Sequence, residues 1–302
     1  MEEKKMRKQK KLLAVILSII MIFSLAACGN NSNDGESGGY DTMNFFTTES
    51  SLVYDWLNIL YDSLIAYDDE YNAIPRAAKD WTVSDDGKTW TFNLRDDIYF
   101  SDGEQLTSAD VKWTYEHAID SYMYSTHADG FESIECPDEF TVVFNCSHPK
   151  PDMLYQIIPI LPEHVWANVE DPLTYETTDI VGSGPFRYDS ARSGSGSTAF
   201  VKNGEYWGDV PKLDVLVFTK YDAIAQALKL GEVDAAYTLE ITQKETLEAA
   251  GNIDVQTFGT YDFEYVGYNL LDDICKDKTV RHAIDYCIDR DTVIEMSYAG
   301  LA

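Results

Sequence analysis

Residues 81–113 read W-T-V-S-D-D-G-K-T-W-T-F-N-L-R-D-D-I-Y-F-S-D-G-E-Q-L-T-S-A-D-V-K-W. In the middle of this stretch, Trp90, Phe92 and Leu94 alternate with threonine and asparagine, and this period of two predicts a strand with one buried face. The S-D-D-G sequence before the strand predicts a turn, because glycine takes positive φ without strain. By itself, this pattern fits many α/β proteins.

The second half of the stretch predicts a short strand and a capped helix. Ile98 to Phe100 form the expected strand, which ends at the next S-D-G. Thr107 is expected to cap a helix, with Asp110 three residues later as an acidic variant of the capping box. Apolar residues follow at helical spacing and should face the core: Val111, Tyr115, Ala118 and Ile119.

The order of these motifs is more specific than their secondary structure. S-D-D-G, T-W-T-F, L-R, F-S-D-G and L-T-x-x-D-V resemble the signature of the large peptide-type solute-binding proteins (family 5). These are extracellular receptors of ABC importers for oligopeptides, dipeptides, nickel and some sugars. Later segments resemble further family motifs in the same order: G-S-G-P-F at 182–186, N-G-E-Y-W-G at 203–208, G-E-V-D at 231–234, Y-N at 268–269, and V-R-H-A-I to I-D-R at 280–290. The resemblance runs from about residue 47 to the last residue.

This resemblance implies an α/β fold of the periplasmic-binding-protein-like type II, with an extra β-rich subdomain. We expect lobe I at 41–262, the inserted subdomain at about 66–178, and the crossing segment and start of lobe II at 263–302. Family members continue well beyond the 280–290 helix, so the first lobe would be nearly complete and the second mostly missing. The apolar face of that helix would then lack a partner, and residues after about 268 should pack poorly or associate with another molecule.

Smaller elements are expected along the rest of the chain. An apolar stripe at 52–64 predicts a first helix that packs on a sheet, and 134–146 predicts a hairpin. The glycines of 182–186 are interpreted as a tight turn closed by proline rather than as a phosphate site, since no Rossmann pattern surrounds them. Three further expectations are a buried strand at 215–218, a helix at 223–230 ended by Gly231, and a strand at G-E-V-D.

The N-terminus resembles a lipoprotein signal peptide at 1–27. A basic start precedes the apolar segment 12–23, which is shorter than the roughly 20 residues that span a bilayer. L-A-A-C at 25–28 then matches a lipobox, which makes Cys28 the predicted site of lipid attachment. An ordinary signal peptide or signal anchor with an incidental cysteine is the alternative. Residues 28–40 are rich in Gly, Ser and Asn and predict a flexible tether.

Charge and cysteine usage restrict the partners. The formal net charge of the chain is -29, and residues 28–302 carry 17 basic and 50 acidic side chains. Such a surface disfavours nucleic acid and anionic lipid, and it favours solubility outside the cell. The cysteines after Cys28 do not face one another in the expected elements, so we expect free thiols: Cys136, Cys146, Cys275 and Cys287.

The resemblance also suggests ligand contacts. Family members hold extended peptides partly by backbone pairing, as an added strand, and the matching positions here are Phe45, Phe46, Thr47 and Thr48. Aromatic side chains would face the ligand at Tyr237, Tyr261 and Tyr265, and less strongly at Tyr122 or Tyr124. The chain has 20 tyrosines, so each of them could instead be a packing or surface residue. The acidic residue that anchors a peptide amino group in the family belongs to lobe II and cannot be assigned.

Motifs of catalysis are absent from the sequence: it holds no G-x-S-x-G, H-E-x-x-H or Walker pattern. The five histidines lack the spacing of metal ligands, and we expect no catalytic residue, metal or cofactor. The function that the resemblance implies is capture of an oligopeptide or dipeptide outside the cell and delivery to the ABC permease. Alternatives are a sugar or nickel-chelate binder, a non-functional truncated remnant or structural surface lipoprotein, and, least supported, a secreted hydrolase.

Overall fold

The computed structural model describes residues 51–298, except 122–123, 156, 171, 173–174, 176–178, 195, 220–222, 237–242 and 258–263. The chain divides into two compact units, 1–218 and 219–302. The expected lobe boundary at 262/263 stays a prediction. Within the described ranges, no helix has the length and apolar content needed to cross a bilayer.

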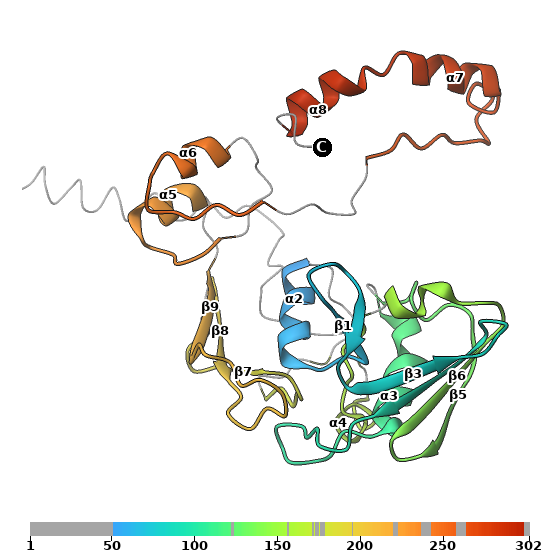
Figure 1. Ribbon diagram of the computed structural model, residues 1–302, viewed down its shortest axis with the longest axis vertical. Coiled ribbons are helices and arrows are strands. Elements are labelled where there is room, and N and C mark those ends of the chain that lie inside the picture. The colour runs from blue at the N-terminus through green and yellow to red at the C-terminus, as the bar shows by residue number, and fades with distance from the viewer. Residues whose placement is uncertain are drawn as a thin grey trace, which may run out of the picture. The chain divides into compact units, whose positions relative to one another are not determined.

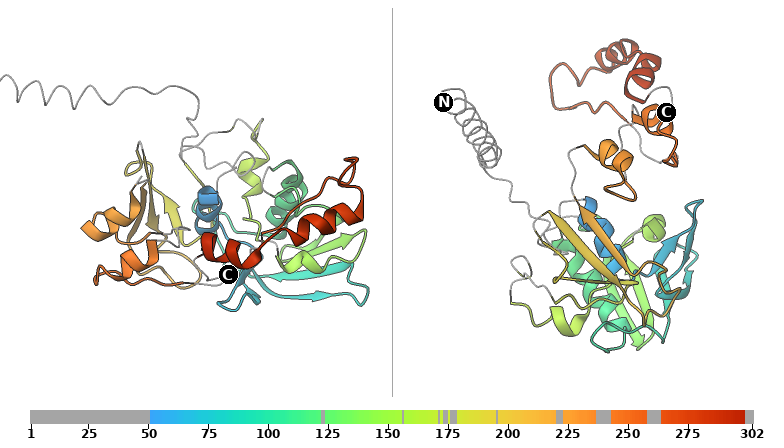
Figure 2. Two further views of the ribbon diagram at one scale, coloured as in Figure 1. Left: turned by 90° about the horizontal axis from the view of Figure 1, so that it is seen from above. Right: turned by 90° about the vertical axis from the view of Figure 1, so that its left-hand side faces the viewer.

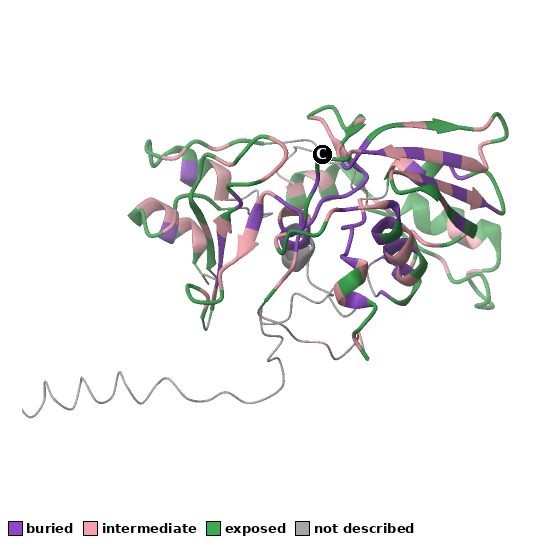
Figure 3. Ribbon diagram, turned by 90° about the horizontal axis from the view of Figure 1, so that it is seen from below, coloured by how far each residue is buried: buried purple, intermediate pink, exposed green. Residues whose placement is uncertain are grey.

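A four-stranded antiparallel sheet organises much of the first unit. Its order is β3-β4-β6-β5, and α3 packs along one face against β5 and β6 (Figure 1, Figure 2). The alternation predicted around Trp90, Phe92 and Leu94 is confirmed, because all three are buried, and Figure 3 shows the same alternation along the strands. The elements are β3 (Ala78–Val83), β4 (Thr89–Leu94), α3 (Ser108–His117), β5 (Phe131–Asp138) and β6 (Thr141–Cys146). β5 and β6 form the predicted hairpin.

The capped helix of the signature is confirmed, but the strand before it is not. Thr107 accepts a hydrogen bond from the amide of Ala109, and Asp110 accepts one from the amide of Thr107 at 2.8 Å. Segment 98–100 forms only an isolated bridge at Tyr99, because the chain turns back at once with Gly103 at φ 96°. Val111, Tyr115 and Ala118 are buried as predicted. Ile119 is 52% exposed, so the prediction is wrong at this position, which lies after α3 in η1 (Ala118–Asp120).

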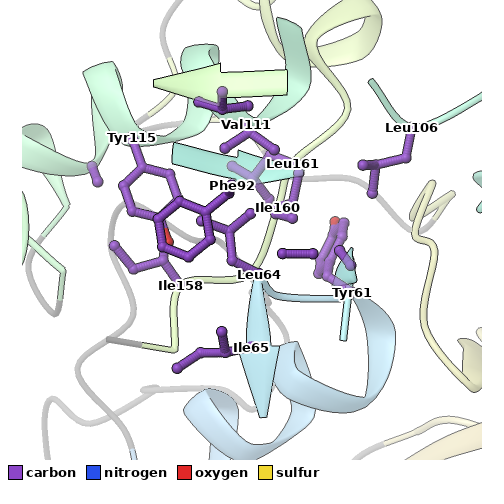
Figure 4. Packing of buried hydrophobic residues seen from close by; sticks show 14 of the residues in the cluster. Tyr61, Leu64, Ile65, Phe92, Leu106, Val111, Tyr115, Ile158, Ile160 and Leu161 are labelled. Atoms are coloured by element: carbon purple, nitrogen blue, oxygen red, sulfur yellow. The ribbon is translucent and has the colours of Figure 1, made fainter. Parts of the chain in front are cut away.

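The first helix and its hairpin complete the core. α2 (Ser51–Leu60) leads into β1 (Ile65–Tyr67), which pairs with β2 (Ala73–Pro75). The predicted stripe is confirmed where side chains are described: Trp56, Leu57, Leu60, Tyr61 and Leu64 are buried. Figure 4 shows Tyr61 and Leu64 close to Ile160 and Leu161, which come from a later segment. The short helices η2 (Pro151–Tyr155) and α4 (Glu163–Trp166) flank that segment.

A three-stranded sheet, β7-β8-β9, ends the first unit. Its strands are β7 (Phe186–Tyr188), β8 (Ser197–Lys202) and β9 (Val215–Thr219). The rings of Trp56 and Phe218 lie 5.7 Å apart, so α2 packs on this sheet. The strand predicted at 215–218 is confirmed as β9, but its predicted burial is wrong, since Val217 is 57% exposed. β9 is one of the two edge strands of this sheet, and its Leu216 and Phe218 lie on the side that meets the core.

Among the described residues of the second unit, only Ala227 and Leu247 are buried, so its helices lack a core comparable to that of the first unit. α5 (Ile224–Leu230) ends at Gly231 in the left-handed conformation, as predicted. No strand forms at 231–236, so the expectation for G-E-V-D is wrong. The helix predicted from 280 onward is confirmed as α7. The remaining helices are α6 (Lys244–Glu248), α7 (Lys278–Tyr286) and α8 (Arg290–Tyr298). None of the residues 264–298 is buried, in agreement with the expected poor packing.

The described cysteines form no disulfide, as predicted. The four described cysteines are free thiols: Cys136, Cys146, Cys275 and Cys287. In the hairpin, Cys146 lies opposite Phe131 rather than Cys136, whose thiol donates to the carbonyl of Ser108 at 3.2 Å.

Candidate functional site

Most of the predicted site residues lie outside the described part of the chain. These are Cys28, Phe45, Phe46, Thr47, Thr48, Tyr237 and Tyr261. Tyr265 is described and is 78% exposed. Its neighbour Glu264 accepts a hydrogen bond from the hydroxyl of Tyr298 at 2.9 Å, which ties the start of this segment to α8. The ligand-binding role of all these residues stays a prediction.

The structure instead brings together a polar cluster around Asp62, which the sequence did not reveal. Asp62 follows α2 and is fully buried. Its Oδ1 accepts from Arg76 Nε at 2.8 Å and from the Tyr206 hydroxyl at 3.1 Å, and its Oδ2 accepts from Trp207 Nε1 at 2.9 Å. We name the group Asp62, Arg76, Ser183, Tyr206 and Trp207 the Asp62 junction. A buried carboxylate is tolerated because it is paired and hydrogen-bonded in this way.

The backbone of Asp62 is also hydrogen-bonded to distant segments. Its amide donates to Ser183 Oγ at 2.9 Å, and its carbonyl accepts from the amide of Ile160 at 2.8 Å. The partners of the junction are far apart in sequence, with Ser183 separated from Asp62 by 121 positions and Trp207 by 145. One residue therefore joins the end of α2 to the loop before β7 and to the loop after β8.

The glycines of the G-S-G-P-F motif have a different role from the predicted tight turn. Neither Gly182 nor Gly184 has a positive φ. A Cβ atom on Gly182 would lie within 3.0 Å of the carbonyl oxygen of Leu60, and one on Gly184 equally close to that of Ile59. The amide of Gly184 donates to Leu60 O at 2.8 Å and so caps the last turn of α2. These glycines are needed for the close approach of two backbones.

Two residues of the signature stretch 81–113 contact the Asp62 junction or the glycine motif beside it. The amide of Ser101 donates to the carbonyl of Gly182 at 2.9 Å. Arg95 lies over the ring of Trp207, with its guanidinium carbon 4.3 Å from the ring centroid, and forms two hydrogen bonds to Asp97. Four family motifs therefore meet at the end of α2: F-S-D-G, L-R, G-S-G-P-F and Y-W-G. Their contacts pack these segments against one another.

The electrostatics of the junction keep its donors protonated. Burial raises the pKa of the Tyr206 phenol, and the negative charge of Asp62 raises it further. Burial alone would lower the pKa of Arg76, but the negative charge of Asp62 and its hydrogen bond to Arg76 outweigh this effect and the net shift is upward. Tyr206 thus remains a hydrogen-bond donor and Arg76 a cation. Both carboxylate oxygens of Asp62 are hydrogen-bonded to donors of the junction, an arrangement suited to holding the fold rather than to acid–base chemistry.

One signal in the sequence could have indicated a buried charge here. Asp62 interrupts an otherwise apolar run, I-L-Y-D-S-L-I at 59–65, and charged residues are almost never buried without a partner. That signal indicates a buried charge, but it does not identify Arg76 or the distant indole as its partners. Among the described residues, no group of three His, Cys, Asp or Glu side chains is arranged to hold a metal ion.

Comparison with known proteins identifies the family. Residues 72–302 match the bacterial extracellular solute-binding proteins, family 5 (middle part). The chain belongs to this family, as its motifs suggested. It is 29% identical over 285 residues to a putative ABC transporter peptide-binding protein of Brucella ovis, covering 88% of this chain. It is also 23% identical to the oligopeptide-binding protein AppA of Bacillus subtilis over 97% of this chain.

Solved structures share the fold. NikZ from Campylobacter jejuni in complex with Ni(L-His) matches 87% of this chain with a TM-score of 0.70 and 23% identity. AppA from Bacillus subtilis in complex with a nonapeptide matches 83% with a TM-score of 0.69 and 23% identity. The predicted periplasmic-binding-protein-like α/β fold is therefore confirmed. The chain spans about half of the matched lengths, 54% of the Brucella relative, 53% of NikZ and 52% of AppA.

Proposed function

We propose that this chain is the substrate-binding component of an ABC importer, which captures peptides outside the cell and delivers them to the permease in the membrane. The observation that carries this proposal is the family match over residues 72–302, together with relatives described as peptide-binding proteins. The mechanism is reversible capture without bond chemistry. Within the family, ligands commonly select a closed form, a population shift rather than a reaction.

The proposal extends to the membrane. The basic and apolar start of the chain and the L-A-A-C sequence support a lipid anchor at Cys28 on the outer side of the cell membrane. A single acyl chain binds membranes only marginally, with a constant of about 10⁴ M⁻¹, whereas two or more chains anchor stably. Replacement of Cys28 by Ala should release the protein into the medium or leave it unprocessed, as read by membrane fractionation. Unchanged retention at the mature size would contradict the anchor.

The proposed ligand contacts are the ones that the family resemblance suggests. Phe45, Phe46, Thr47 and Thr48 would pair with the peptide backbone, and Tyr237, Tyr261 and Tyr265 would supply aromatic surface. Tyr265 is the described member of this set, and its 78% exposure is compatible with contact to a ligand. A tyrosine offers a large apolar area with a polar tip, which suits peptides of varied sequence.

Binding can be tested directly with the 302-residue chain. Isothermal titration with a synthetic pool of short peptides with free termini should give heat of binding. Thermal unfolding in the presence of the same pool should show a higher melting temperature. Tyr265→Ala should weaken binding, whereas Tyr286→Ala is the matched control, because Tyr286 is also a highly exposed tyrosine of the second unit, at 91%. An absence of binding to peptides, with binding to a nickel–histidine chelate or a sugar instead, would replace the peptide by that ligand class.

A further inference from the structure

One edge of β9 is open among the described residues, because β8 is its one hydrogen-bonded neighbour in the three-stranded sheet. The start of β9 is fixed to the end of β8: Asp214 O accepts from the amide of Lys202 at 3.0 Å, and the two side chains form an ion pair at 2.5 Å. An edge strand exposes backbone N–H and C=O groups that can pair with one further strand.

The direction of these backbone groups follows from the bond at Asp214. The C=O and N–H of one peptide group point to opposite sides, so the amide of Val215 points away from β8 when the carbonyl of Asp214 points toward it. Backbone groups alternate along a strand, and those of Val217 and Thr219 therefore also point to the open edge. Those of Leu216 and Phe218 point to β8.

The other edges of the two larger sheets carry features that prevent the addition of a strand. β3 has the exposed charges of Lys79 and Asp80, with a register shift beside them. β5 contains Glu132, Glu135 and Pro137 and has two register shifts. β7 has only three residues. β9 reads V-L-V-F-T, five residues without a charge or a proline, so it lacks this protection.

Both faces of β9 are apolar. Val215 is 36% exposed and Val217 is 57% exposed, and residues two apart on a strand share a face, so these side chains form an apolar stripe. On the other face, Leu216 packs against the core, and the ring of Phe218 lies 5.7 Å from that of Phe200. An added apolar strand would extend both faces.

We propose that β9 pairs with β9 of a second copy of this chain, antiparallel about a two-fold axis at Val217. The proposal does not depend on the proposed function. In this register Val217 faces its own copy and Val215 faces Thr219, and these are the residues whose backbone groups point to the open edge. Leu216 then faces Phe218 at the closer, non-hydrogen-bonded positions, and aliphatic–aromatic cross-strand pairs are favourable.

This pairing forms a closed but weak dimer. Each chain uses its β9 edge once, so a two-fold pair leaves no β9 edge for a third copy. A five-residue strand pair is a small interface, which gives low affinity. The formal net charge of -29 on each chain opposes association, and salt screens this repulsion. The dimer should therefore strengthen as the salt concentration rises.

The test is sedimentation velocity of the 302-residue chain over a range of protein concentrations, at low salt and in about 0.5 M NaCl. Val217→Lys should raise the dimer Kd at least about tenfold, because two lysines would face each other across the axis. Val83→Lys is the matched control, since Val83 is 48% exposed on the edge strand β3, and its Kd should equal that of the wild type. Both variants keep the apolar segment 12–23, so association through that segment is the same in both.

Hydrogen exchange measured residue by residue by NMR separates this pairing from other contacts. As the protein concentration rises, the amides of Val215, Val217 and Thr219 should gain protection, because they enter the new strand pair. The amides of Leu216 and Phe218 should not change, because they point to β8. This alternating pattern is measured on the wild type and needs no variant.

Each other result overturns the proposal. A wild type that stays monomeric at high concentration and high salt does so, and so do equal Kd values for the wild type and Val217→Lys. Growth beyond a dimer also contradicts a closed two-fold pair. Protection of Val215 and Val217 that does not change with concentration would show that the chain covers this edge itself, and no second copy would then be needed.

Discussion

The end of α2 and the helix α7 start from the same kind of sequence and reach opposite environments. Both segments place apolar residues at helical spacing. Around α2, Leu57 and Leu60 are buried, and the Asp62 junction joins the helix to distant segments. In α7, no residue is buried and Ile284 is 37% exposed. The described side-chain hydrogen bonds of α7 join it only to the segment 268–277 just before it, such as the bond from the Tyr268 hydroxyl to Asp285 at 2.8 Å. An apolar face predicts a helix, but a facing partner is needed for a core.

The largest expected effect is at the junction itself. Asp62→Ala would leave Arg76, Tyr206 and Trp207 as donors without their acceptor. Removing one partner of a buried ion pair costs about 3–5 kcal/mol, and the free energy of unfolding should fall by this amount in a urea titration followed by Trp fluorescence. Asp285→Ala in α7 is the control and should change it by less than about 0.5 kcal/mol. Equal effects of the two substitutions would remove the contrast between the regions.

The close approach at Gly184 gives the next effect. Gly184→Ala would force a methyl group against the carbonyl of Ile59, and such overpacking typically costs about 1–3 kcal/mol. Gly204→Ala is the control, because nothing lies within 4 Å of its added Cβ and its φ is not positive. Thermal unfolding should show a lower midpoint for the first variant alone. If Gly184→Ala melts like the wild type, the motif is not required for backbone contact.

A smaller effect should appear on acidification. Burial lowers the pKa of His127, and the charge of Lys150 lowers it further. Because the unfolded chain then binds the proton more readily, stability should fall as the pH drops from about 6.5, the ordinary value for histidine, toward the folded pKa. His127→Gln should reduce this slope in urea titrations across that range. His282 of α7 is exposed and is the control position. His282→Gln should leave the fall in stability that His127 causes on acidification unchanged.

The smallest expected effect is on the apolar face of α7. Ile284→Ala removes a side chain that is already 37% exposed and should change the free energy of unfolding by about 0.5 kcal/mol or less. Leu57→Ala in α2 removes a buried leucine of the core and should cost about 2–5 kcal/mol. Urea titration of both variants compares the two regions directly. A loss of several kcal/mol for Ile284→Ala would mean that α7 is covered in solution.

Local sequence patterns were sufficient for much of the fold. The alternation in β4, the capping box at Thr107 and the glycine that ends α5 are set by residues within one turn or one strand of each other, and each was predicted correctly. The failures have two causes. The strand at 98–100 is cut short by the turn at Gly103, whereas the burial of β9 and the strand at G-E-V-D depend on which element lies alongside. A short apolar run cannot specify that neighbour.

The candidate site, like the fold, has a part that the sequence predicted and a part that it did not. The family motifs gave the class of protein and suggested contacts such as Tyr265, but they did not indicate that Asp62, Ser183 and Trp207 meet. Their separation in sequence is too large for any periodicity to relate them. Gly184 illustrates the limit: its motif was apparent, yet its purpose, the approach to the carbonyl of Ile59, became visible only with the fold.

By itself, the sequence determined the family, the main helices and the free state of the four described cysteines, because these follow from local spacing and motif order. Tertiary structure alone decided that the motifs converge on Asp62 and that α2 is held at its end by a buried carboxylate. It also decided that the apolar face of α7 is left exposed within the described residues. The physical reason is that burial and long-range hydrogen bonds are properties of pairs of segments, and a pattern within one segment does not contain its partner.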